Sequence, residues 1–189
     1  ITTNTQHLPA VAWTPDNANG NYVVVWESSE DGTQGKDIWM QRYDKSDAAL
    51  GGAVKVNTDT DATNQQTPVV AMDNAGNFVV AWAGHDVNND GIVARRFDSN
   101  GSPSAPFVVN EYTTGSQKEP AIALNAATGD FVVSWKSSQL LESGEVYARQ
   151  YGADGVAATA ETRINAFTLG DQKDPDVGMA DDGSVVVTW

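Results

Sequence analysis

The sequence predicts an all-β fold, a β-propeller built from four-stranded antiparallel blades. Each repeat of about fifty residues contains four strand-like runs separated by turns rich in Asp, Asn and Gly, and no segment shows a helical period. A motif of glycine, an aromatic or apolar residue, a valine-rich run and tryptophan marks the repeats, at residues 20–26, 76–82, 129–135 and 183–189. A repeat of this length with four strands is typical of a propeller blade.

The first strand of each repeat follows a Gln-x-x-Pro motif, and proline suits the first residue of a strand, where no ladder donor is needed. The glutamine recurs in the same phase, at Gln6, Gln65, Gln117 and Gln172. A repeated glutamine could bind a ligand four times over. We expect instead that its amide pairs with backbone groups where one blade leads into the next, because buried polar groups need partners.

The second strand is the valine-rich motif itself. It is apolar at every position, as in residues 22–26, which indicates burial on both faces and favours stacked blades over the alternative, a tandem β-sandwich array. Its last residue is always tryptophan, which we expect to pack between blades: Trp26, Trp82, Trp135 and Trp189.

The third strand carries more charge, as expected nearer the rim, and the fourth ends in asparagine. These strands divide the chain into blades at residues 1–58, 59–111 and 112–166 and a half blade at 167–189. Propellers close with about four to eight blades, so about three and a half blades should not close a ring alone. We expect another copy, or the remainder of a longer chain, to complete it.

The formal net charge of −14 argues against nucleic acid and anionic membrane surfaces as partners. No apolar run approaches the roughly 18 residues that a membrane-inserted helix needs. Cysteine is absent, which excludes disulfides, thiolate metal sites and cysteine nucleophiles and favours a bacterial source.

One loop resembles the start of a calcium site. Asp86, Asn88 and Asp90 alternate and are followed by Gly91, which is how oxygen-rich calcium loops begin. The bidentate acid that would complete an EF-hand is missing, because Phe97 stands at its position. One interpretation of the motif is a structural Ca²⁺ site, and the commoner one is an ordinary Asp/Asn/Gly turn.

The loops after the second and fourth strands should share one face of the propeller, and they are rich in acids. This face could gather cations or bind a glycan or protein ligand, or it could be a solvated acidic rim. The ligand candidates are Asp31 and Asp37, which belong to this face, and Trp39, whose equivalents in the other repeats are Val93 and Tyr147.

Enzyme chemistry has little support in the sequence. His7 and His85 neighbour no nucleophile or zinc motif, and most carboxylates recur with the turns. A carboxylate pair for glycoside hydrolysis is compatible with the composition, but no residue is marked as catalytic. We therefore predict that the chain is not an enzyme.

The combined pattern of Gln-x-x-Pro, Gly-Asn-Phe-Val-Val-x-Trp, Ala-Arg-Arg-Phe-Asp and Val-Asn resembles repeats of large secreted or surface-displayed bacterial proteins. It is also similar to Asp-box propellers, but the spacing of Asp73, Gly76 and Trp82 departs from Asp-x-Gly-x-x-Trp, so sialidase catalysis is not implied. The resemblance implies an extracellular or cell-surface module for binding, adhesion or scaffolding. The alternatives are a filament or spacer subunit and, with least support, a glycan-active hydrolase or lyase.

Overall fold

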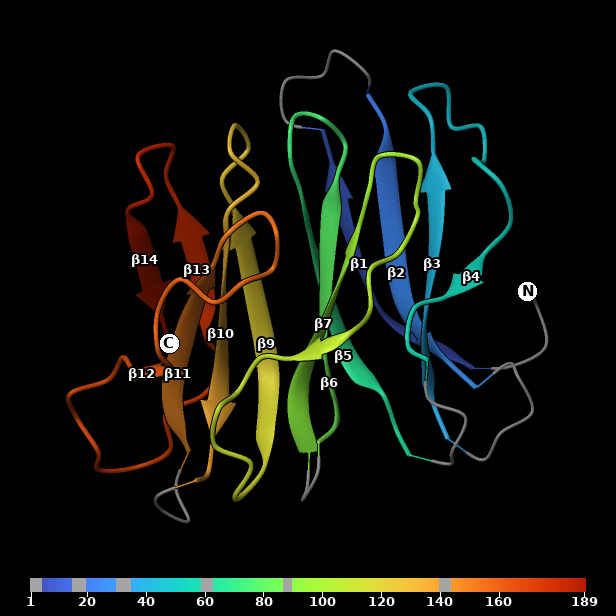
Figure 1. Cartoon of the computed structure of the whole chain (residues 1–189). Helices are drawn as coiled ribbons and strands as arrows, with labels where there is room; N and C mark the ends of the chain where they lie inside the picture. Colours follow the sequence, from blue (N-terminus) through green and yellow to red (C-terminus); the bar gives the residue numbers. More distant parts are fainter. Residues whose placement is uncertain (1–4, 15–19, 30–34, 59–62, 87–89, 140–143) are drawn as a thin grey trace.

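The computed structural model describes residues 5–14, 20–29, 35–58, 63–86, 90–139 and 144–189. These residues form strands and turns without a helix (Figure 1), so no helix among them could cross a membrane. They form three four-stranded sheets and one two-stranded sheet, each antiparallel throughout and each following the order of the chain. The predicted all-β architecture of four-stranded antiparallel sheets is therefore confirmed.

We call each sheet a blade. Blade 1 contains β1 (Gln6–Trp13), β2 (Tyr22–Ser28), β3 (Asp37–Tyr43) and β4 (Val54–Lys55). Blade 2 contains β5 (Gln66–Met72), β6 (Phe78–His85), β7 (Asp90–Phe97) and β8 (Phe107–Val108). Blade 3 contains β9 (Gln117–Leu124), β10 (Phe131–Ser137), β11 (Glu145–Tyr151) and β12 (Thr162–Arg163). The half blade contains β13 (Asp176–Met179) and β14 (Val185–Thr188).

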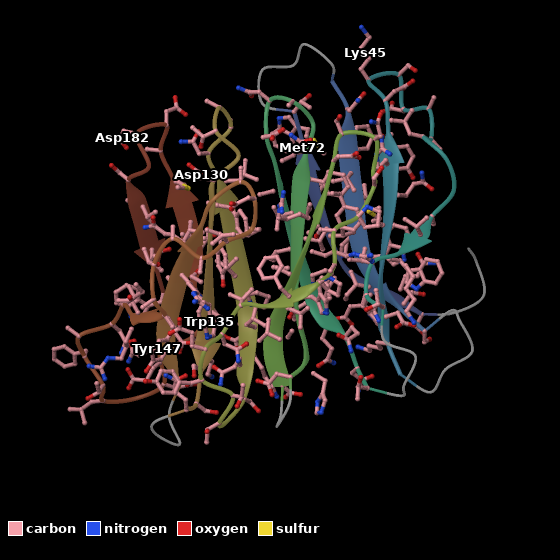
Figure 2. The ribbon with its side chains drawn as sticks, viewed as in Figure 1. Lys45, Met72, Asp130, Trp135, Tyr147 and Asp182 are labelled. Atoms are coloured by element: carbon pink, nitrogen blue, oxygen red, sulfur yellow. The ribbon has the colours of Figure 1, made fainter. Side chains whose placement is uncertain are left out.

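The first strands of the blades are the inner strands. β1 contacts β5, β5 contacts β9, and β9 contacts β13, so the blades lie side by side with their first strands adjacent. In Figure 1 the β5–β6, β9–β10 and β13–β14 turns lie at the top, and the link from β8 to β9 reaches the bottom. Figure 2 shows the turn residues Asp130 and Asp182 at the upper end, and Trp135 and Tyr147 toward the lower end.

The blades pack through two unlike faces. The front face of a blade, which contacts the next blade, carries small or aliphatic side chains, and in blade 2 these are Val79, Ala81, Ile92 and Ala94. The back face, which contacts the preceding blade, carries the large ones, and in blade 3 these are Phe131, Val133, Trp135, Tyr147 and Tyr151. Stacked ring pairs recur on the back faces, with centroids 4.8 Å apart for Phe78–Phe97 and 5.0 Å apart for Phe131–Tyr151.

This packing explains the unbroken apolar second strand. In blade 2, which has a neighbour on each side, every residue of β6 from Phe78 to Gly84 is buried. β2 instead alternates between buried and half-buried residues, because no other described blade covers its Tyr22, Val24 and Trp26 side. Burial on both faces thus depends on position among the blades.

Arginines of the third strands join neighbouring blades in both directions. Toward the preceding blade, Arg95 donates to the Val56 carbonyl at 2.6 Å, and Arg149 donates to the Val109 carbonyl at 3.1 Å. Toward the next blade, Arg42 donates to the Ser99 carbonyl at 2.8 Å, and Arg96 donates to the Asp154 carbonyl. We call these four contacts the arginine clamps.

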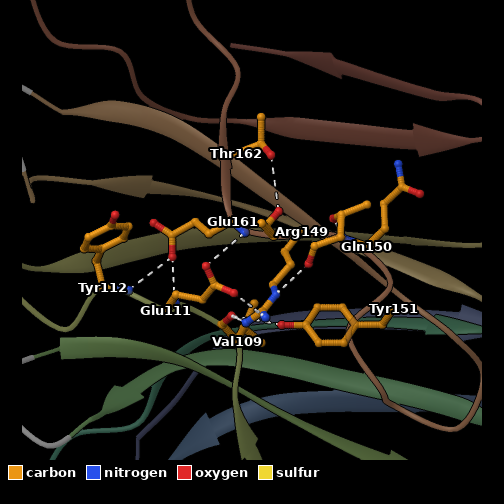
Figure 3. A network of polar contacts seen from close by, with 10 residues as sticks. Val109, Glu111, Tyr112, Arg149, Gln150, Tyr151, Glu161 and Thr162 are labelled. Carbon is orange, nitrogen blue, oxygen red and sulfur yellow. Dashed lines mark hydrogen bonds and ion pairs between the residues drawn. The ribbon is translucent and has the colours of Figure 1, made fainter.

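The clamp made by Arg149 belongs to a larger network (Figure 3). Its guanidinium also pairs with Glu111 at 2.5 Å and lies over the ring of Tyr151, 5.6 Å from the centroid. Glu111 and Glu161 each accept a hydrogen bond from the backbone N–H of the other. The Tyr151 hydroxyl donates to the Val109 carbonyl at 2.9 Å, and burial raises the pKa of this phenol to about 12.

We expect Tyr151 to make the protein less stable as the pH rises from about 10 to about 12. In this interval the phenol is ionised in the unfolded chain but still protonated in the fold, so raising the pH favours unfolding; below about pH 10 neither state is ionised. The free energy of unfolding can be measured with urea at about pH 9 and at about pH 11.5. Between these pH values it should fall by about 2 kcal/mol less in Tyr151→Phe than in the parent protein. Tyr112→Phe, at an exposed tyrosine, should leave the loss unchanged. Equal losses in Tyr151→Phe and the parent would contradict the assignment.

The clamps also explain why glycine stands in the turns that they contact. Gly155 has φ +81°, and a Cβ there would lie 2.9 Å from Cδ of Arg96. Gly183 has φ +84° in a turn with the same backbone hydrogen bond, but its Cβ would meet nothing within 4 Å. Gly155→Ala should therefore lower the free energy of unfolding by about 1–2 kcal/mol more than Gly183→Ala, because only the first displaces a clamp. Equal losses by chemical denaturation would show that the φ angle alone matters.

Candidate functional site

The residue before each repeated proline has an unusual backbone conformation. Its φ angle is positive in all four repeats, at 47° for Leu8, 50° for Thr67, 55° for Glu119 and 52° for Asp174. Residues before proline favour extended conformations, and a non-glycine residue with positive φ is uncommon. Four occurrences in the same phase show that the repeat specifies this conformation.

In the three complete blades this residue lies in a β-bulge. The pairing register of the inner strand shifts between His7 and Ala10 in β1, between Gln66 and Val69 in β5, and between Lys118 and Ala121 in β9. Bulges redirect side chains and are common beside functional sites. We call the residue pairs at the entrance of the adjacent inner strands the mouth: residues 7–8, 66–67, 118–119 and 173–174.

Carboxylates hold this conformation in place. The Thr67 N–H donates to Glu27 Oε1 at 2.8 Å, and Glu27 is 1% exposed with its other oxygen 2.7 Å from Lys36 Nζ. The Asp174 N–H donates to Glu119 Oε2 at 2.9 Å. Each contact runs from one blade to the residue before the proline of the next. Contacts between blades thus hold the conformation of Thr67 and Asp174.

Two carboxylates and two ammonium groups come together at one side of the mouth. Glu119 lies in β9 and Asp174 lies just before β13, and the hydrogen bond just described joins them. Lys118 pairs with Asp90 at 3.0 Å, and Lys173 lies 4.0 Å from Asp174. Lys118, Lys173 and Asp174 are exposed, and Glu119 is half-buried. Such a surface can both exchange protons and donate hydrogen bonds to a polar ligand.

The sequence alone did not single out Glu119 and Asp174. Both stand at the third position of Gln-x-x-Pro, which the sequence leaves variable. The fixed proline after them was the available signal, because it marks the residue whose side chain the bulge redirects.

Of the repeated glutamines, Gln65 and Gln117 are buried, whereas Gln172 is half-buried and Gln6 is exposed. Gln65 Oε1 accepts a hydrogen bond from Trp82 Nε1 at 2.8 Å, and Gln172 accepts one from Trp189 at 2.9 Å. On the donor side, Gln117 Nε2 lies 3.1 Å from the Thr114 carbonyl in the link that enters its blade. Gln65 and Gln172 therefore bind the tryptophan that ends the second-strand motif, whereas Gln117 binds the link that enters its blade.

The asparagine that ends each fourth strand pairs with an acid at the third strand. In blade 1, Asn57 Nδ2 donates to Asp37 Oδ1 at 2.7 Å, and in blade 3, Asn165 donates to Glu145 at 2.5 Å. Blade 2 has Gly91 at the acid's position. There Asn110 donates to Asp86 at 3.1 Å, and a Cβ on Gly91 would lie 2.7 Å from Cβ of Asp86. A loop aspartate thus occupies the space of the missing strand acid.

This arrangement separates the side chains of the predicted calcium loop. Asp86 is 7% exposed and faces Asn110, whereas Asp90 pairs with Lys118. Asn88 lies outside the described residues. Among the residues that the structure describes, no three His, Cys, Asp or Glu side chains form a group that could hold a metal ion. Calcium binding at this loop stays a prediction.

The weaker ligand candidates do not meet at the mouth. Asp31 lies outside the described residues. Asp37 is 3% exposed, and it pairs with Lys55 at 2.7 Å as well as with Asn57. Trp39 is half-buried on the back face of blade 1, opposite Trp26 in the β2–β3 pairing.

No family model and no curated protein sequence matches this chain. Its fold matches those of solved glycoside hydrolases. The α-L-arabinanase of Penicillium chrysogenum, solved with arabinobiose, has a TM-score of 0.66 at 13% identity, and the match covers 96% of this chain and 58% of the arabinanase. The GH93 α-L-arabinofuranosidase of Fusarium graminearum gives 0.61 at 14% identity over the same shares. The Hadza microbial sialidase Hz136 gives 0.59 at 12% identity, covering 94% of this chain and 37% of the sialidase.

The chain has a β-propeller fold. This comparison corrects one prediction: the expectation that the chain is not an enzyme is contradicted, because the propellers that it matches are glycoside hydrolases. That expectation rested on assigning the carboxylates to turns, and it overlooked the position that the bulge redirects. The comparisons give no support to an adhesion role. The chain spans 58% of the arabinanase, so it corresponds to a little over half of that protein.

The pairing of Asp86 with Asn110 can be tested by moving the acid. Asp86→Gly alone should cost about 1–3 kcal/mol, because the buried Asn110 amide loses one of its two acceptors and keeps only the Tyr112 carbonyl. Gly91→Asp alone should also destabilise, since its Cβ would overlap Asp86. The double variant places the acid on the strand, as in blades 1 and 3, and should recover most of the free energy of unfolding that each single variant loses. The measurement is urea unfolding with excess EDTA. If the double variant loses the sum of the two single losses, the exchange is refuted.

Proposed function

We propose that this chain forms part of a glycan-active β-propeller, a glycoside hydrolase or lyase whose sugar binds across the mouth. One observation carries the proposal: Glu119 of β9 and Asp174, which lies just before β13, share the same positive-φ backbone conformation, and Glu119 accepts a hydrogen bond from the Asp174 backbone N–H. The likeness to sugar-cleaving propellers supports the same class of activity.

The chemistry of glycoside hydrolysis explains why two carboxyl groups matter. One donates a proton to the leaving oxygen, and the other acts as nucleophile or activates water, with separations of about 5–5.5 Å or about 6.5–9.5 Å in the two classes. Glu119 and Asp174 can divide these roles because β9 holds Glu119 and the hydrogen bond from the Asp174 N–H to Glu119 holds the two residues together. A rigid mouth preserves their geometry while a sugar binds.

The side chains of the mouth suit a sugar. Lys118 and Lys173 are exposed and can donate hydrogen bonds to its hydroxyl groups. Leu8, which is 54% exposed, offers an apolar contact for the carbon-bound hydrogens of a sugar ring. Polar donors beside a small apolar surface are typical of sites that bind polar organic ligands.

A location outside the cell or at the bacterial surface fits this proposal, because polymeric glycans are found there. The blade count belongs to the proposal as well. We take the described sheets as three and a half blades of a ring that further blades complete, either from the remainder of a longer chain or from another copy.

Isosteric substitution tests the carboxylate pair. Glu119→Gln and Asp174→Asn should each lower the rate of reducing-sugar release at least about 100-fold, because the amides cannot transfer protons. The substrates are arabinan, arabinobiose and a sialylated oligosaccharide, which match the ligands and activities of the similar folds. Asp181→Asn, in the turn at the opposite end of the half blade, is the matched control and should keep full activity.

Thermal unfolding of the three variants separates lost chemistry from lost structure, and the amide variants should melt within about 3 °C of the parent protein. The proposal fails if the parent protein cleaves no substrate in the panel. It also fails if both amide variants cleave at the parent rate.

A further inference from the structure

A cavity of about 370 Å³ lies between blades 2 and 3, at the end of the sheets opposite the mouth. Residues of the β5–β6, β7–β8, β9–β10 and β11–β12 turns line it, and the structure describes all four turns. In Figure 1 the β5–β6 and β9–β10 turns lie at the top. The length of β5, about 20 Å, separates Thr67 of the mouth from Asp73 of the cavity. The cavity is therefore a different site from the mouth.

The lining of the cavity is partly apolar and partly charged. Val79 of blade 2 and Leu124 of blade 3 contribute apolar surface. Arg96, Asp73 and Asp98 contribute a guanidinium group and two carboxylates. Sites for small organic ligands occupy about 300–1,000 Å³ and combine apolar walls with a few polar groups. The size and lining of the cavity match this description.

Arg96 has donors to spare. Its Nη1 donates to the Asp154 carbonyl, and the guanidinium makes no other hydrogen bond to the described residues. Arg42, at the same position of blade 1, instead donates from two nitrogens, to the Asn100 carbonyl and to the Ser99 carbonyl. Nε and Nη2 of Arg96 can therefore donate to a ligand, while the bond to blade 3 holds the guanidinium in place.

The two carboxylates are held by their own turns and keep acceptor capacity. Asp98 Oδ1 accepts from the backbone N–H groups of Ser102 at 2.7 Å and Asn100 at 2.9 Å, and these bonds, first that of Ser102, hold the pKa of Asp98 below its usual range. Each oxygen of Asp73 accepts one hydrogen bond from Asn77, at 2.8 Å. Because an ionised carboxylate has about four acceptor sites, both can accept further hydrogen bonds.

This mixture of charges favours a neutral ligand that carries hydroxyl groups. An anion would pair with Arg96 but would also meet the carboxylates of Asp73 and Asp98, and a cation would meet the guanidinium. A hydroxyl group suits both, because it accepts from a guanidinium and donates to a carboxylate. The carbon-bound hydrogens of a sugar ring can contact Val79 and Leu124. A sugar residue therefore satisfies every part of the lining.

We propose that this cavity is a sugar-binding site separate from the mouth, which holds one residue of a neutral glycan in the joint between blades 2 and 3. The site binds without cleaving, so it does not depend on catalysis at the mouth. Its walls come from two blades, and a sugar there joins their turns as the Arg96 clamp does.

Nuclear magnetic resonance of the ¹⁵N-labelled protein tests the site. L-Arabinose, D-galactose and D-glucose are the probes, added up to millimolar concentrations. The backbone N–H signals of Ser102 and Gly129, which line the cavity, should shift and saturate with at least one sugar. Sodium acetate should shift neither signal. The N–H signals of Lys118 and Lys173 report the mouth separately, so binding at one site is distinguished from binding at the other.

Two variants with matched controls locate the binding. Arg96→Lys should weaken it at least about tenfold, because lysine can reach the Asp154 carbonyl but lacks the second nitrogen of the fork. Asp98→Asn keeps the Oδ1 acceptor of its turn, loses the other acceptor and should also weaken binding. Arg42→Lys and Asp44→Asn change the equivalent clamp and turn in blade 1, and both should bind like the parent protein.

Four results would overturn the proposal. The first is that no sugar shifts the Ser102 and Gly129 signals. The second is that the shifts are confined to Lys118 and Lys173. The third is that acetate binds in place of the sugars, which would assign Arg96 to carboxylate recognition. The fourth is that Arg42→Lys weakens binding as much as Arg96→Lys does.

Discussion

The packing of a small-residue front face against a large-residue back face is the constraint on which the rest of the structure depends. Val79 and Ala81 of blade 2 leave space that Phe131 and Trp135 of blade 3 fill, and the same relation joins blades 1 and 2. This fit sets the distance between sheets, which allows Arg95 and Arg149 to reach the carbonyls of a neighbouring blade. It also keeps the inner strands adjacent and so assembles the mouth.

The sequence predicted the fold well because the constraint acts on periodic positions. The apolar run of β6 required two neighbours, and the turn residues separated four strands in each repeat. It predicted the candidate site poorly for a related reason. Glu119 and Asp174 occupy a position that each repeat fills differently, and residues before proline are normally extended, so neither charge periodicity nor local propensity indicated their redirected side chains.

Contacts across blades were the other feature that the sequence did not show. Arg95 and Arg149 had the pattern of rim residues, and their partners lie about forty positions away on another sheet. The glutamine–tryptophan bonds were missed because each residue had a sufficient explanation by itself. Gln41 shows the same limit, because it stands in β3 where Arg95 stands in β7 and donates instead to the Arg42 carbonyl of its own blade.

The exchange at Asp86 and Gly91 changes what equivalence between repeats means in this protein. Blades 1 and 3 carry an acid on the strand, and blade 2 carries it on the preceding loop, yet all three present a carboxylate oxygen to the same asparagine. In a residue-by-residue alignment, blade 2 has Gly91 where the other blades have the acid. In space, however, a carboxylate oxygen of Asp86 lies against the asparagine of blade 2 as the strand acids do in the other blades. The repeat is therefore a pattern of oxygen and nitrogen positions, and more than one backbone path supplies it.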